Sequence, residues 1–176
     1  MNSIVARVVI GIVALSPCLI PLDGAPQEVP VFREPFLLKL HIDDEHYYEE
    51  KFGRVPYVLN NEVYLFAGET FGINVIVAQN QPSRISYQPN PAKADVQFKF
   101  AQEKTTNGVT MQLVIRNKLK RPLFLDGRMT VPSKKEIYET GILPVKPSLR
   151  NVESWPHPIV QLVLRNFRFS ESDREN

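Results

Sequence analysis

Cysteine is nearly absent from the sequence, and this scarcity excludes several kinds of site. The one cysteine, Cys18, lies close to the N-terminus, inside a stretch with the features of a targeting segment. The remainder of the chain therefore has no disulfide, no cysteine nucleophile and no cysteine-based metal site. A domain without these features must be held together by its apolar core, which is feasible at roughly 150 residues.

Strong charge and familiar catalytic motifs are also lacking. The formal net charge is only +2, which gives no general attraction to nucleic acid, so we expect no nucleic-acid partner. The sequence contains no Gly-x-Ser-x-Gly elbow, no Ser-x-x-Lys, no His-Glu-x-x-His and no glycine-rich phosphate loop. We therefore expect a protein that is not an enzyme and that needs no cofactor.

Residues 1–25 have the pattern of a secretory signal peptide. Arg7 supplies a positive charge, and the apolar run that follows, residues 8–15, is too short to span a bilayer. We predict cleavage after Ala25 and a periplasmic or extracellular location. An uncleaved N-terminal anchor is the alternative, and it would be the chain's only membrane contact. Lipidation of Cys18 is a further alternative.

Residues 26–170 predict one domain built from short strands. Apolar and polar residues alternate in several segments, 15 prolines separate these segments, and no stretch predicts a helix of ten or more residues. The clearest strands are predicted at residues 36–43, 63–66, 70–79, 95–105, 109–117, 123–131 and 159–169. Asn60-Asn61 predicts a turn just before residues 63–66. Residues 171–176 form a polar tail that we expect to be disordered.

The central prediction is a hairpin over residues 95–117. Asn107-Gly108 favours a two-residue turn, because both residues tolerate positive φ. This turn would place Phe100 opposite Ile115 in the core, with Lys99 facing Arg116 on the solvent side. The last predicted strand changes parity near Arg165-Asn166, which indicates a bulge.

These patterns favour an all-β fold. About seven to nine short antiparallel strands with turns between them are typical of an immunoglobulin-like β-sandwich. A small up-and-down β-barrel is the alternative.

Two histidines and a carboxylate suggest one candidate metal site. His41 and Asp43 lie on one face of the first strand, and His46 could fold back beside them from the next loop. Such a set suits zinc or non-haem iron, and it would imply a metal-dependent enzyme. The spacing matches no established motif, so a solvated strand end is the simpler interpretation.

The only tryptophan suggests a second candidate site. Trp155 and His157 are framed by prolines, and with Tyr47 and Tyr48 they could bind a carbohydrate or another small ligand by stacking. The simpler interpretation is that Trp155 closes one end of the core.

A basic run suggests an electrostatic contact. Arg116, Lys118, Lys120 and Arg121 could bind phosphate or an acidic partner, although most such runs are exposed loops. Taken together, the sequence favours an exported, non-catalytic β-sandwich that binds another protein or assists cell-envelope assembly. Pairing at the edge of a sheet is a common binding mode for such folds.

Overall fold

The computed structural model describes residues 29–105 and 108–171. The signal peptide with its predicted cleavage after Ala25, Cys18, and nearly all of the predicted tail lie outside the described residues. The regular secondary structure of the described residues consists of strands, apart from the 3-10 helix η1 (Pro91–Lys93).

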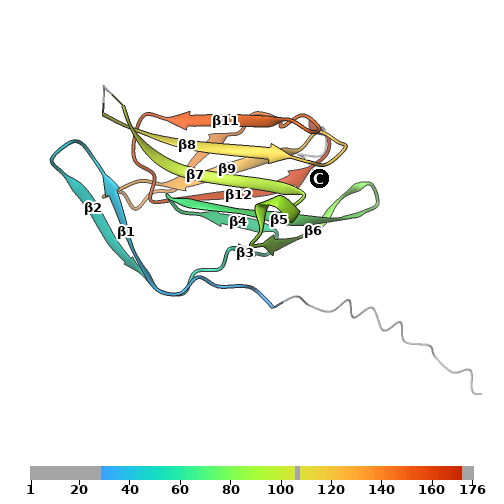
Figure 1. The fold of residues 1–176 in the computed structure, drawn as a ribbon, viewed down its shortest axis with the longest axis horizontal. Coiled ribbons are helices and arrows are strands. Elements are labelled where there is room, and N and C mark those ends of the chain that lie inside the picture. The colour runs from blue at the N-terminus through green and yellow to red at the C-terminus, as the bar shows by residue number, and fades with distance from the viewer. Residues whose placement is uncertain (1–28, 106–107, 172–176) are drawn as a thin grey trace, which may run out of the picture.

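Two five-stranded sheets pack face to face as a sandwich (Figure 1). In spatial order, the first sheet contains β3 (Val58–Leu59), β4 (Glu62–Leu65), β12 (Gln161–Arg168), β9 (Phe124–Thr130) and β10 (Tyr138–Gly141). The second contains β6 (Gln81–Gln88), β5 (Glu69–Ala78), β7 (Val96–Thr105), β8 (Gly108–Asn117) and β11 (Arg150–Trp155). The predicted β-sandwich is confirmed, and the two separate sheets do not form a barrel.

Alternating apolar residues build the core between the sheets. Phe98 and Phe100 of β7 are almost fully buried, as are Leu113 and Ile115 of β8. Lys99 between the two phenylalanines is exposed, and Val114 between Leu113 and Ile115 is only half-buried, so each strand buries one face more deeply than the other. The two apolar sets therefore share a sheet face, as the sequence predicts.

The predicted register of this hairpin is wrong by two residues. Phe100 pairs with Leu113 rather than Ile115, and Lys99 pairs with Val114 rather than Arg116. Because Thr105 pairs with Gly108, the connection is residues 106–107, which lie outside the described residues. A shift of two preserves which side chains face the core, so the apolar pattern alone cannot distinguish the two registers.

Two local predictions are confirmed. The Asn60-Asn61 pair joins β3 to β4 with φ values of 51° and 58°, as a type I′ turn requires. The predicted bulge in β12 is also present, with a register shift between Arg165 and Arg168 and a φ of 54° at Asn166.

A separate hairpin of β1 (Phe36–His41) and β2 (Tyr47–Phe52) lies at one end of the sandwich (Figure 1). It has its own small apolar cluster, in which Leu38 and Leu40 pack against Phe66 and Val160 of the sandwich. The side-chain amide of Gln102 holds it further, donating to the His41 carbonyl and accepting from the His41 backbone N–H.

Candidate functional site

A buried arginine fixes the segment that leads into the sandwich. Arg33 is only 5% exposed, and its guanidinium forms a two-point ion pair with Glu69, at 2.5 and 2.7 Å. The same group donates to the carbonyls of Pro56 and Tyr64. Its central carbon lies 3.9 Å from the centre of the Tyr57 ring. These contacts neutralise the buried charge and hold residues 29–35 against the molecule.

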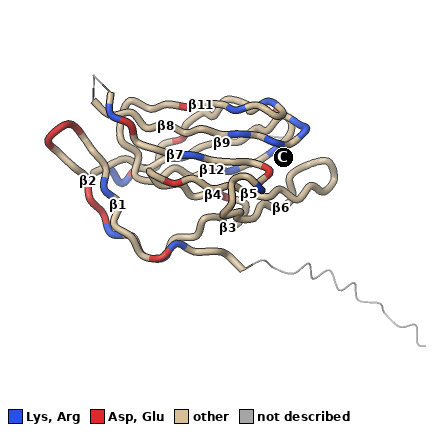
Figure 2. The backbone as a smooth tube through the Cα atoms, viewed as in Figure 1, with Lys and Arg blue, Asp and Glu red and all other residues tan. Residues whose placement is uncertain are grey.

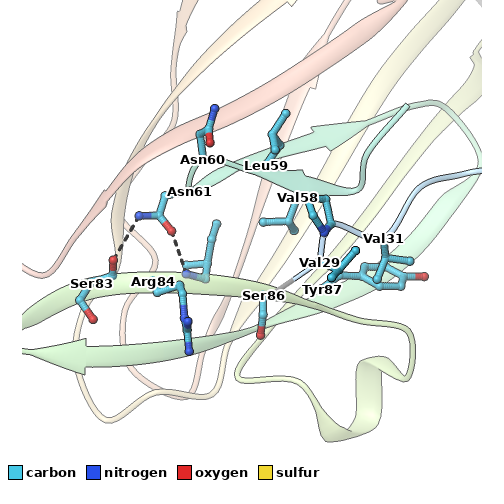
Figure 3. Close-up of a pocket in the computed structure, with 12 residues that line it drawn as sticks. Val29, Val31, Val58, Leu59, Asn60, Asn61, Ser83, Arg84, Ser86 and Tyr87 are labelled. Atoms are coloured by element: carbon cyan, nitrogen blue, oxygen red, sulfur yellow. Dashed lines mark hydrogen bonds between the residues drawn. The ribbon is translucent and has the colours of Figure 1, made fainter. Parts of the chain in front are cut away.

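Next to this network, a groove of about 530 Å³ runs between the edge strands β3 and β6 (Figure 3). Val58 and Ile85 are buried beneath it, whereas Val29 and Val31 of the lead-in segment are 80% and 46% exposed. Tyr87 also lines the groove, where its ring stacks on Tyr57 at 4.1 Å. The groove is therefore mainly apolar, and it borders one edge of each sheet.

Asn61 occupies part of the β6 edge. Its side-chain amide donates to the Ser83 carbonyl at 3.2 Å and accepts from the Ile85 backbone N–H at 3.0 Å (Figure 3). A residue of a neighbouring strand would form the same two bonds with its own backbone N–H and C=O. The type I′ turn at Asn60-Asn61 aims this amide at β6, so the turn and the edge are linked.

Further along β6, backbone N–H and C=O groups face away from β5, as they do at an unpaired sheet edge. Because the Ile85 N–H points away from β5, the alternation of an antiparallel strand turns the Ile85 carbonyl and both Tyr87 backbone groups outward as well. Within the described part of the chain, no backbone partner is found for these three groups. An extended peptide could continue the ladder there, with alternate side chains in the groove.

The other sheet edges are shorter or covered. β3 has two residues, β10 has four and β11 has six, against eight in β6. Asn151 and Glu153 of β11 both bond to the backbone of Leu143, which brings that loop alongside the strand. Short and covered edges resist pairing with another chain, so β6 is the edge best suited to it.

The structure brings together only part of the predicted metal site. His46 Nδ1 lies 2.8 Å from the Asp43 carboxylate, which also accepts the backbone N–H groups of Glu45 and His46. The Glu45 N–H bond first, and then the two bonds to His46, hold the pKa of Asp43 below its usual value.

His41 lies apart from this pair, with its ring 4.4 Å from that of Tyr47. No group of three or more potential metal ligands occurs among the described residues. The pairing of Asp43 with His46 is explained by a capped turn between β1 and β2, and a metal site remains a prediction.

The predicted aromatic site is divided between two parts of the molecule. Trp155 is 8% exposed, packs edge-on against Phe100 and donates its indole N–H to Thr140 at 3.0 Å. Tyr47 is exposed on the β1–β2 hairpin, where Lys39 lies over its ring. The burial of Trp155 favours the structural interpretation over stacking on a sugar.

The remaining two residues of that prediction have local partners. Tyr48 is half-buried in the hairpin cluster and donates to Glu50, and burial is the main cause that raises its pKa to about 12. His157 has its ring nitrogen beside the carbonyl of Pro158. Ligand binding at these residues stays a prediction.

Sequence reasoning missed the residues that form the groove. Val31, Val58, Ile85 and Tyr87 come from three distant segments, and no local spacing connects them. The Asn60-Asn61 turn was the one local signal at this place.

Comparisons with protein-family models, with curated proteins and with solved structures find no match. Among the described residues, no helix has the length and apolar character to cross a membrane.

Proposed function

We propose that the chain is an exported, non-catalytic β-sandwich that binds another protein by accepting an extended segment at the edge of β6. The observation that carries the proposal is the outward-facing backbone of Ile85 and Tyr87 beside an apolar groove. An added strand gains main-chain hydrogen bonds from such an edge and specificity from side chains in the groove.

The Asn61 contact supports this mode of binding. The Asn61 side-chain amide already bonds to the Ser83 carbonyl and the Ile85 N–H, as a neighbouring strand would. An incoming segment would continue from Asn61 toward Tyr87, so the edge has a defined starting point for its register.

Selection of peptides from a phage-displayed random library tests the proposal. We expect the wild-type protein to select extended peptides with alternating apolar residues. Val31→Asp should weaken their binding by roughly tenfold or more, because a charge would border the apolar groove. Val152→Asp is the matched control, since Val152 is 45% exposed on β11 and Val31 is 46% exposed.

Equal binding to wild type and Val31→Asp would contradict the proposal. So would a selection in which no enriched peptide distinguishes Val31→Asp from Val152→Asp.

A further inference from the structure

A buried asparagine organises the end of the sandwich at which β8 finishes. Asn117 is fully buried, and its side-chain amide donates to the carbonyls of Arg121 and Val145, at 2.7 and 2.9 Å. Its backbone N–H donates to the carbonyl of Leu149. These bonds bring the segments 116–121 and 145–150 together, although almost 30 residues separate them in sequence.

The two segments form what we term the basic end. It consists of six exposed cations, Arg116, Lys118, Lys120, Arg121, Lys146 and Arg150. Arg116 pairs directly with Arg150 across the ladder of β8 and β11, an arrangement that is unfavourable without a neighbouring anion. No cation of the basic end forms an ion pair with another described residue.

Two of these cations have neutral partners. Lys118 donates to the carbonyls of Pro91 and Ala92, and Arg121 donates to that of Asn80. The nearby Asp95 carboxylate accepts the backbone N–H of Val75. The positive charge of the basic end is therefore mostly uncompensated.

Acidic residues gather at the other end of the molecule. Figure 2 shows them at the tip of the β1–β2 hairpin, whereas Lys and Arg cluster where β8 ends. The formal net charge of +2 hides this separation. A molecule so polarised would turn its basic end toward a negatively charged surface.

Exposed leucines accompany the cations. Leu143 and Leu149 are 64% and 54% exposed, and they flank Lys146 in the same loop. Neither 116–121 nor 143–150 contains an aromatic residue on which a nucleic-acid base could stack. Cations mixed with exposed aliphatic side chains suit a surface that offers both negative headgroups and an apolar layer.

We propose that the basic end docks on the surface of a bilayer that contains anionic phospholipids. The cations contact the headgroups, and Leu143 and Leu149 enter the apolar layer beneath them. Each Lys or Arg held near such a surface strengthens binding by about fivefold.

Flotation with lipid vesicles tests this proposal. The wild-type protein should float with vesicles of mixed phosphatidylcholine and phosphatidylglycerol, and it should remain in solution with phosphatidylcholine alone. Arg116→Gln combined with Arg150→Gln should lower the partition coefficient by about 25-fold. Leu149→Ser should lower it by roughly fivefold or more, because an apolar contact is lost.

Lys134→Gln combined with Lys135→Gln is the matched control. Both lysines are exposed in the loop after β9, outside the basic end, and the double variant changes the net charge by the same amount. It should alter partitioning by less than about twofold. Thermal unfolding followed by circular dichroism identifies any variant that fails to fold, and Leu149→Ser then provides an independent comparison.

Three results would overturn the proposal. The first is equal binding to zwitterionic and anionic vesicles. The second is an equal loss of vesicle binding in the Arg116/Arg150 double variant and in the Lys134/Lys135 double variant. The third is binding to heparin without binding to anionic vesicles. The last result would assign the basic end to a soluble polyanion. All three are independent of peptide binding at β6, because no groove residue belongs to the basic end.

Discussion

Arg33 and Glu69 form an ion pair whose two side chains are only 5% and 19% exposed. Both partners of the pair are satisfied, since Glu69 also accepts the backbone N–H of Phe66 and Arg33 binds two carbonyls. Breaking such a pair from one side leaves an uncompensated buried charge, which is far more costly than losing an exposed pair.

Arg33→Ala should therefore lower the free energy of unfolding by about 3–5 kcal/mol. Urea denaturation measures the change. Lys39→Ala is the control, because it removes an exposed ion pair with Glu49 and should cost less than about 1 kcal/mol. Similar losses in the two variants would mean that the Arg33 network contributes little to stability.

Tyr87 gives the protein a dependence on alkaline pH. Burial first, and then its contact with Tyr57, raises the pKa of Tyr87 to about 12. The pKa of Tyr87 in the folded protein lies above the value of 10.0 for an unperturbed tyrosine. The neutral hydroxyl of Tyr87 therefore stabilises the fold below pH 10. That contribution is lost as the pH rises from 10 to 12.

Between pH 10 and pH 12, we expect the free energy of unfolding to fall less steeply for Tyr87→Phe than for the wild-type protein. Guanidinium unfolding at a series of pH values compares the two. Parallel curves for wild type and Tyr87→Phe would show that Tyr87 is not the group responsible.

At the scale of elements, the alternation of apolar and polar residues is the sequence signal that predicts the fold. It predicts β5, β7, β8 and β12 because each buries one face against the opposite sheet. It does not predict β2 or β11. The first is rich in charge and the second lies at a sheet edge, so neither has a regular apolar face.

The candidate site is predicted less well than the fold. The groove depends on Val31, Val58 and Ile85 meeting across the sandwich, and the basic end depends on bonds from Asn117 to distant carbonyls. Such contacts are set by topology rather than by spacing along the chain. The basic run 116–121 is apparent in the sequence, but its junction with 145–150 is not.

Substitutions in β7 test the assignment of its faces. Phe100→Ala should cost roughly 3–5 kcal/mol, because it empties an aromatic site in the core. Lys99→Ala should change the free energy of unfolding by less than about 0.5 kcal/mol, since Lys99 faces solvent. Chemical denaturation gives both values, and a Lys99→Ala loss as large as that of Phe100→Ala would invert the faces.

At the scale of the whole molecule, the two sheets and the docked hairpin enclose two apolar clusters. The single cysteine lies outside the described residues, and no potential metal cluster occurs within them. We expect the melting temperature, measured by calorimetry, to be unaffected by EDTA or by a reducing agent. A large decrease with EDTA would revive the metal site at His41, Asp43 and His46.

The separate locations of the β6 groove and the basic end suggest two contacts for one small protein. An extended segment of a partner would bind at the sheet edge, while the basic end meets an anionic surface. Both contacts would use features of the folded molecule rather than catalytic chemistry.

Amide hydrogen exchange at Tyr87 tests strand addition at β6 most directly. Nuclear magnetic resonance would follow this amide in the free protein and in complex with a peptide selected by the groove. We predict strong protection of the Tyr87 N–H on binding and unchanged exchange at Val152, on the edge of β11. Tight peptide binding that leaves the Tyr87 amide exchanging as in the free protein would contradict strand addition at this edge.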